Sequence, residues 1–195
     1  MRHAKSIRLF HNPLLEACTH VHPLTPLLLW LPVIFYFIFQ SFYLVESSLL
    51  FAGYALSGFI FWTLAEYFLH RYLFHFEAKS KIGKYFVYLF HGIHHEDPDD
   101  ATRLVMPPVP AILMASCLYF IFALFIPANG LKLFFSFFMM GYLCYDYIHF
   151  AIHHFPLKKT WWKKIRKNHL IHHARHSTRY GVSSPLWDHI FRTFK

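Results

Sequence analysis

The chain has 195 residues, of which 56% are hydrophobic, 21% aromatic and only 15% charged, and its mean hydropathy is +0.32. Soluble globular proteins carry about 25% charged residues, so this composition excludes an ordinary soluble domain and indicates a membrane protein with a single domain. The formal net charge of +9 would suit a nucleic-acid-binding protein, but the basic residues are distributed as at a membrane surface. We therefore expect no nucleic-acid partner.

Residues 1–23 are basic and mixed, without a continuous apolar core. We expect them to form a cytoplasmic tail rather than a cleavable signal peptide. Residues 24–195 are expected to form one membrane domain. The three cysteines, Cys18, Cys117 and Cys144, show no C-x2-C spacing, so they are interpreted as packing residues and not as disulfides or metal ligands.

Four apolar segments follow, each close to the roughly 20 residues that a transmembrane helix needs. They cover residues 24–43, 48–68, 108–127 and 131–150. The loops inside the first pair and inside the second pair are very short, so each pair is predicted to be a helical hairpin. The expected fold is all-α and integral to the membrane, with four transmembrane helices in two hairpins and a cytoplasmic, helical, histidine-rich cap.

The basic residues predict the orientation. Of the 19 lysines and arginines, only Lys132 lies at a short connecting loop. All others lie in the N-terminal tail, in the segment 69–107 or after residue 150. Because basic loops stay in the cytoplasm, these three regions are predicted to be cytoplasmic.

Ten histidines form four clusters in these regions or at their edges, with the spacings H-x4-H, H-x2-HH, H-x3-H and H-x2-HH. They are His70 and His75; His91, His94 and His95; His149 and His153; and His169, His172 and His173. Neutral imidazole is a common ligand of iron and zinc. Ten imidazoles are too many for one ion and suit two, although the spacing does not say which histidine binds which metal.

Helix geometry orders these clusters further. Residues three and four apart share a helix face, so the members of the last three clusters should project together. His70 and His75 are five apart, about 140° around a regular helix. We expect this pair either to straddle a helix end or to approach two different metals.

Other polar residues are candidates for orienting the imidazoles through their second ring nitrogen. They are Glu66, Asp146 and Asp188, and the alternative for each is an ordinary interfacial carboxylate. His154 and His176 extend the third and fourth clusters and are expected to be supporting or substrate-side donors, not metal ligands. No catalytic residue is expected beyond the ligands. The basic run from Lys158 to Lys167, around Trp161 and Trp162, is interpreted as a lipid-headgroup contact, with docking of an acidic redox partner as the alternative.

The order of the histidine clusters resembles the fatty acid hydroxylase superfamily of integral-membrane di-iron enzymes. The stretches His70–His75, His91–His95, Arg103–Pro108, Tyr145–His149 and Gly181–Asp188 are most similar to its fatty acid 2-hydroxylase branch. The resemblance extends from about residue 60 to the C-terminus. Many eukaryotic members also carry an N-terminal cytochrome b5 domain, and the short tail here leads us to expect that this chain lacks it.

The resemblance implies an O2-dependent lipid hydroxylase with two iron ions, which adds a 2-hydroxyl group to a long-chain fatty acyl group of a ceramide-like sphingolipid. Zinc can substitute for iron in a purified sample, because it binds the same imidazoles more tightly. The electrons should come from a separate carrier, such as a cytochrome b5-like protein or a ferredoxin. The metal site should face the cytoplasm, at the endoplasmic reticulum of a eukaryote or the inner membrane of a bacterium.

Two alternatives remain. A sterol desaturase or oxidase, or a carotenoid hydroxylase, would belong to the same superfamily. A metal transporter or storage protein is more distant, because transport sites usually lie near the bilayer midplane, whereas these clusters gather at one face. The Phe-rich third and fourth segments could form an acyl path, although plain helix packing explains the same residues.

Overall fold

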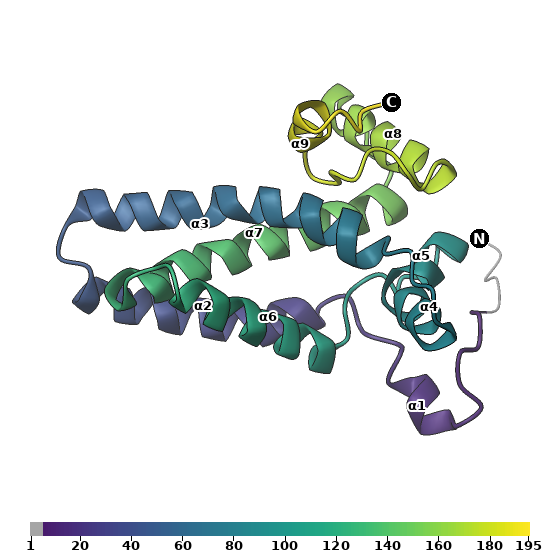
Figure 1. The fold of residues 1–195 in the computed structure, drawn as a ribbon, viewed down its shortest axis with the longest axis horizontal. Coiled ribbons are helices and arrows are strands. Elements are labelled where there is room, and N and C mark those ends of the chain that lie inside the picture. Colours follow the sequence, from purple (N-terminus) through teal and green to yellow (C-terminus); the bar gives the residue numbers. More distant parts are fainter. Residues whose placement is uncertain (1–5) are drawn as a thin grey trace.

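The computed structural model describes residues 6–195, and within that range every regular element is helical. Four long helices lie side by side as two hairpins (Figure 1). These helices are α2 (Thr25–Leu44), α3 (Ser48–Phe68), α6 (Pro108–Ala123) and α7 (Ala128–His154). The prediction of an all-α fold is confirmed.

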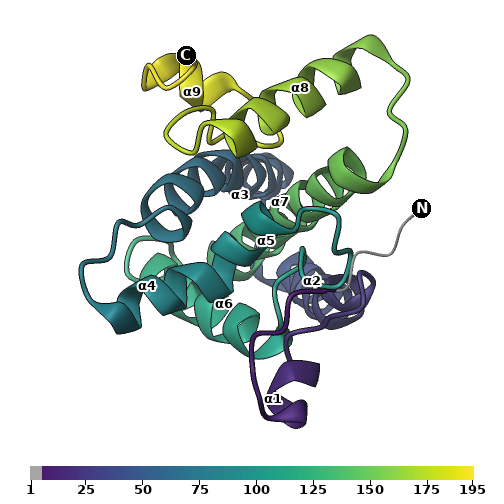
Figure 2. The ribbon, with the colours of Figure 1, turned by 90° about the vertical axis from the view of Figure 1, so that its right-hand side faces the viewer.

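Short helices gather at one end of this bundle, while the loops that close the two hairpins lie at the other end (Figures 1 and 2). The short helices are α1 (Pro13–Ala17), the π-helix η1 (Leu69–Phe74), α4 (Lys81–Val87), the π-helix η2 (Tyr88–Gly92), α5 (Ile93–Glu96), α8 (Thr160–Ala174) and α9 (Leu186–Ile190). All segments that carry histidine clusters therefore meet at one end of the molecule.

The helix ends differ from the expected spans in the second hairpin. Helix α6 stops at Ala123, before the end of the predicted segment 108–127, and Pro127 then caps α7. Helix α7 extends beyond residue 150 to His154. By length and apolar composition, α2 and the continuous α3–η1 rod (Ser48–Phe74) could each cross a membrane, and α6 is a shorter apolar helix.

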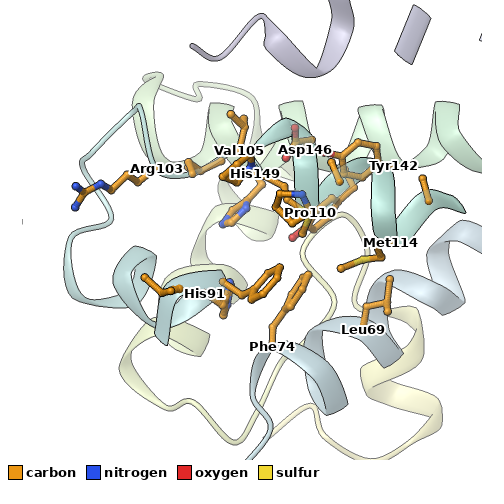
Figure 3. A pocket seen from close by; sticks show the side chains of 18 of the residues that line it. Leu69, Phe74, His91, Arg103, Val105, Pro110, Met114, Tyr142, Asp146 and His149 are labelled. Atoms are coloured by element: carbon orange, nitrogen blue, oxygen red, sulfur yellow. The ribbon is translucent and has the colours of Figure 1, made fainter. Parts of the chain in front are cut away.

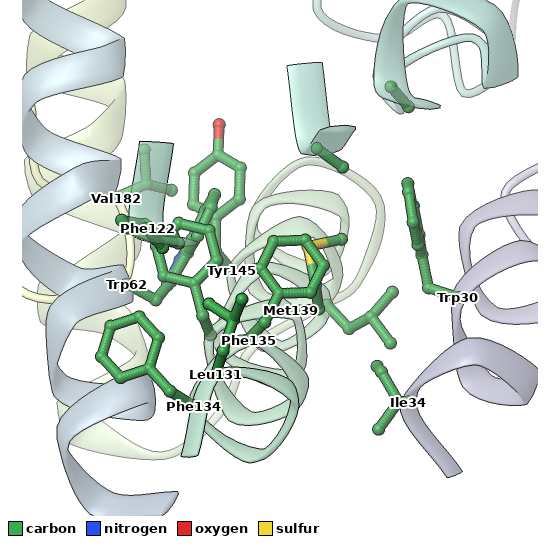
Figure 4. Close-up of a cluster of buried hydrophobic side chains, with 14 of the residues drawn as sticks. Trp30, Ile34, Trp62, Phe122, Leu131, Phe134, Phe135, Met139, Tyr145 and Val182 are labelled. Carbon is green, nitrogen blue, oxygen red and sulfur yellow. The ribbon is translucent and has the colours of Figure 1, made fainter. Parts of the chain in front are cut away.

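Helix α7 is the centre of the packing. Its Phe134, Phe135, Phe138 and Met139 are buried against side chains of the other three long helices (Figure 4). Two glycines let α3 and α7 approach closely. A Cβ atom at Gly58 would lie 2.1 Å from the Phe134 carbonyl oxygen. A Cβ atom at Gly141 would lie 2.6 Å from Trp62 Cβ. The two glycines therefore determine how closely α3 and α7 pack.

Candidate metal centre

The ten predicted ligands lie in two groups of five histidines. Site A consists of His70, His75, His91, His95 and His172, and site B consists of His94, His149, His153, His169 and His173. Within each site, one ring nitrogen of every histidine lies within 4.8 Å of the corresponding nitrogens of the others. The structure thus supplies the partition that the sequence left open.

Each H-x2-HH cluster contributes to both sites. His91 and His95, four residues apart, belong to site A, whereas His94 belongs to site B. In the cluster on α8 the pattern is reversed, since only the middle histidine belongs to site A. Residues four apart lie almost above one another on a helix, so they share a site, while the intervening residue reaches the neighbouring one. The two sites are adjacent, because the rings of His95 and His173 stack with centroids 4.2 Å apart.

The H-x4-H pair reaches a single site because the chain widens into a π-helix. The His75 N–H donates to the His70 carbonyl oxygen, five residues earlier, at 3.1 Å. This wider turn brings residues five apart onto one face. His75 directly follows η1, so the pair straddles a helix end, as one alternative predicted. Both rings belong to site A, so the geometry does not support the other alternative, an approach to two different metals.

The spacing of the ring nitrogens in site A fits a bound metal. The Nε2 atoms of His70 and His91 are 3.0 Å apart, and those of His75 and His172 are 2.9 Å apart. Two nitrogens bound at right angles, with metal–nitrogen bonds of about 2.1 Å, would be separated by about 3.0 Å. These imidazoles are therefore placed like neighbouring ligands of one ion.

Site B shows the same spacing and also orphaned nitrogen atoms. The Nε2 atoms of His153 and His169 are 2.9 Å apart. The Nε2 atoms of His94 and His149 are buried and have no hydrogen-bond partner within residues 6–195. A buried polar atom without a partner is costly, and a metal ion would satisfy both of these nitrogens.

Burial keeps the imidazoles in the neutral form that binds metals. It lowers the pKa of His172 to about 4, partly offset by a hydrogen bond to the Thr178 backbone. Burial, together with repulsion from neighbouring histidines such as His153, lowers the pKa of His173 to about 3. At neutral pH both rings therefore have a free lone pair for coordination.

Two backbone carbonyls orient the rings of site A. His70 Nδ1 donates to the Tyr180 carbonyl oxygen at 2.5 Å, and His172 Nδ1 donates to the Thr178 carbonyl oxygen at 2.7 Å. Each bond leaves Nε2 free to bind the metal. Both carbonyls belong to the loop between α8 and α9, which we call the 175–185 loop. Sequence reasoning missed them, because a backbone carbonyl has no residue signature.

The predicted carboxylates Glu66 and Asp188 hold this loop. Glu66 accepts hydrogen bonds from the Val182 and Ser183 N–H groups at 2.7 and 2.8 Å and from the Ser183 hydroxyl. Asp188 accepts from the Tyr180 and Gly181 N–H groups, both at 2.8 Å. Both acids thus reach site A through the loop and not through a direct bond to an imidazole.

The other three predicted supporting residues do not belong to the five-histidine groups. Asp146 is buried on α7, and its Oδ2 atom has no hydrogen-bond partner among the described residues. The His154 ring packs on Phe150, with centroids 4.5 Å apart. The exposed His176 ring lies 4.6 Å from the His95 ring, at the outer side of site A.

A cavity of about 330 Å³ passes both sites and is lined by His91 of site A and His149 of site B. Figure 3 shows these two histidines between Arg103 at one end and Met114 at the other. The remaining lining is mostly apolar. An apolar cavity that contains a few placed polar groups is the usual form of a small-molecule site, and here it would bring a long apolar molecule past both sites.

The chain resembles proteins of known activity over most of its length. Residues 55–193 match the family model described as fatty acid hydroxylase. The chain is 32% identical over 213 residues to fatty acid 2-hydroxylase of Rattus norvegicus, which covers 97% of this chain and 57% of that protein. It is 38% identical over 170 residues to dihydroceramide fatty acyl 2-hydroxylase FAH2 of Arabidopsis thaliana, covering 85% and 70%. The chain thus spans little more than half of the rat relative.

A solved structure has the same fold. It is titled full-length scs7p with only the hydroxylase domain visible, and it superposes with a TM-score of 0.90 at 34% identity. The match covers 96% of this chain and 71% of the other.

Proposed function

The chain belongs to the fatty acid hydroxylase family, and on this premise we propose that it is a membrane di-iron oxygenase that hydroxylates carbon 2 of a long-chain fatty acyl group. The observation that carries the proposal is the pair of five-histidine sites beside an apolar cavity. Relatives named for 2-hydroxylation of fatty acids and of dihydroceramide acyl chains support a ceramide-like lipid as substrate.

The residues divide the work between metal binding and substrate placement. Sites A and B would each hold one iron ion, and bound iron would supply the redox chemistry that an unactivated C–H bond requires of O2. The Tyr180 and Thr178 carbonyls keep two of the rings in the orientation that exposes Nε2. The apolar cavity binds the acyl chain, excludes water and leads the chain past His91 and His149. Zinc could occupy the same imidazoles by affinity, without the redox chemistry.

We also propose that all four long helices cross the bilayer, with residues 24–195 as one domain and both termini in the cytoplasm. Large apolar side chains on the outside of the bundle support this, including Leu28 (75% exposed) and Leu113 (67% exposed). The basic residues and both metal sites then lie at the cytoplasmic face, as the positive-inside bias requires. The membrane would be the endoplasmic reticulum of a eukaryote or the inner membrane of a bacterium.

A separate electron carrier, such as a cytochrome b5-like protein or a ferredoxin, would dock on the basic face of α8. Lys163, Lys164 and Lys167 are exposed there, and a basic surface attracts an acidic partner in a salt-dependent way. Reversing all three to Glu should slow donor-dependent turnover without loss of metal. The same charge change at Lys79, Lys81 and Lys84 is the matched control. Unchanged rate and salt response would make the α8 surface a lipid-headgroup contact only.

The proposed activity is tested by lipid analysis of cells that express the chain. Mass spectrometry of hydrolysed lipids should show 2-hydroxy fatty acids, which should be missing when His94→Ala is expressed at the same level. A hydroxyl or double bond found only on a sterol, a carotenoid or a mid-chain carbon would instead favour another reaction of the family. A metal transporter or storage protein would change no lipid.

A further inference from the structure

One end of the cavity extends into the helix bundle. Ala111, Met114, Ala115 and Leu118 line it from α6. Their spacing of three and four residues places them on one face of that helix. Phe138 and several later residues of α7 line the opposite wall. The cavity therefore extends between α6 and α7, away from the histidines.

Aromatic rings of α6 and α7 pack together beyond this end of the cavity. The Tyr119 ring of α6 meets the Phe135 ring of α7 edge to face, with centroids 5.1 Å apart. The Phe122 and Phe138 rings meet in the same way at 5.0 Å. Trp62 of α3 packs on Phe138 from the third side at 5.1 Å. Phe138 is fully buried. It is the lining residue of α7 that lies farthest along the helix from His149, so it marks the floor of the cavity.

The floor lies at a defined depth below the metal sites. His149 and Phe138 are eleven positions apart on the same helix, which corresponds to about 16 Å along its axis. A chain that enters past His149 can therefore extend about that far before it meets the aromatic rings.

The two ends of the cavity also differ in polarity. Thr19 and Arg103 line the end away from the floor, where the Arg103 guanidinium pairs with Glu16 at 2.5 Å. The floor end is lined by alkyl and aromatic side chains such as Leu118 and Met139. A lipid would thus keep its polar part toward Arg103 and its hydrocarbon tail toward Phe138.

We infer that the depth of the cavity limits the length of the acyl chain that the protein accepts, and that Ala111, Ala115 and Phe138 set this limit. The inference rests on the proposed function, because it places carbon 2 beside the histidines and the terminal methyl group at the floor. The two alanines leave the lower part of the cavity open. A larger side chain at either position would fill that part and force long chains out.

The test uses the full chain and three variants. Ala115→Leu fills the lower cavity, and Phe138→Leu lowers its floor. Ala123→Leu is the matched control, because Ala123 lies on the same helix, is exposed and does not line the cavity. Expressing cells receive an equimolar mixture of saturated straight-chain fatty acids of graded length, and the 2-hydroxy acids are measured by mass spectrometry.

Ala115→Leu should lower the ratio of the longest to the shortest 2-hydroxy products about tenfold, since a closed apolar pocket discriminates by this order for small size changes. Phe138→Leu should raise the same ratio, and Ala123→Leu should leave it unchanged. Poor folding lowers products of all lengths together, so opposite shifts in two variants cannot arise from it. If Ala115→Leu gives no product, Phe138→Leu decides. Ratios equal to wild type in the variants that give product would overturn the inference.

A second measurement separates this inference from the proposed function. Fatty acids that bind the folded protein raise its melting temperature. The same fatty acids, added singly to purified protein, should stabilise wild type up to a limiting length, and Ala115→Leu should shorten that limit. If Ala115→Leu shortens the longest stabilising fatty acid but cells form no 2-hydroxy product, the proposed reaction would be refuted and the acyl cavity supported. If the longest stabilising fatty acid were the same for wild type and Ala115→Leu, the assignment of the cavity as the acyl-chain site would be refuted.

Discussion

At the scale of single residues, the offset between two histidines on a helix decides whether they join the same five-histidine group. His91 and His95 lie four apart and serve site A, while His94 between them serves site B. A one-residue change of register therefore transfers a ligand from one site to the other. This arrangement links the two sites closely, because the adjoining helices η2 and α5 contribute to the geometry of both.

The two-site assignment predicts different effects for two neighbouring kinds of histidine. His94→Ala removes a ligand of site B, so metal content should fall from two ions per chain toward one, with site A retained. His176→Ala should keep both ions, because this exposed ring lies outside the five-histidine groups. Elemental analysis of purified, fully loaded protein measures the difference. Equal metal loss in both variants would contradict the assignment.

The buried histidines also predict a pH dependence for the metal-free protein. The pKa of His173 is lowered from 6.5 to about 3, and that of His172 to about 4, chiefly by burial. Above pH 6.5 these rings are neutral in both folded and unfolded protein, so they make stability independent of pH. Below it, the unfolded chain gains protons that the folded chain refuses. Each such histidine then lowers the free energy of unfolding by about 1.4 kcal/mol per pH unit, until the pH reaches the pKa of that histidine in the folded protein.

Thermal unfolding of the metal-free protein should therefore show a constant melting temperature between pH 7 and 8 and a steep fall from about pH 6 to 4. A melting temperature that stays level through this acidic range would mean that the rings are not buried as neutral groups.

At the scale of elements, the sequence predicted the long helices well and the local distortions poorly. Apolar segments of helical length, separated by loops of a few residues, were sufficient for the two hairpins. The π-helix η1 was not foreseen, because its wider turn depends on how His70 and His75 pack in site A. Of the 175–185 loop, the resemblance singled out only the part from Gly181 onward. Its role depends on the carbonyls of Thr178 and Tyr180, which any residue type could supply.

The contact between α3 and α7 carries a prediction of its own. Gly141→Ala would place a methyl group 2.6 Å from Trp62 Cβ, and the helices must move apart to accept it. Overpacking of this kind costs about 1–3 kcal/mol, or a melting temperature lower by about 3–10 °C in detergent. Gly53→Ala is the matched control on α3, since nothing lies within 4 Å of its added Cβ. If both variants had the same melting temperature, the close approach of α3 and α7 at Gly141 would not contribute to the stability of the protein.

At the scale of the whole molecule, the histidine sites and most basic residues lie at the same end of the helix bundle. The segments that carry the ten histidines of sites A and B, among them the C-terminal end of α7, meet at the end of the short helices, opposite the hairpin loops (Figure 1). The basic residues within 6–195 follow the same division. Lys132, the exception near a hairpin loop, donates a hydrogen bond to Gln40 of the neighbouring hairpin. A substrate lipid with its headgroup at the interface would therefore present its first acyl carbons at the depth of the metal sites, whereas mid-chain carbons lie deeper.

This division predicts how the chain sits in its membrane. Single cysteines at Ser47 and Asn129, at the hairpin-loop end, should be labelled by an impermeant reagent from the side opposite the cytoplasm. Single cysteines at Lys84 and Lys195 should be labelled only from the cytoplasmic side. The background must first lose Cys18, Cys117 and Cys144, which are exposed in the structure. Because α6 has only 16 residues, about 24 Å of helix, Asn129 is the decisive position. Labelling of Asn129 from the cytoplasmic side would mean that the second hairpin enters the bilayer from the opposite face, and four spans with a cytoplasmic metal centre could not hold.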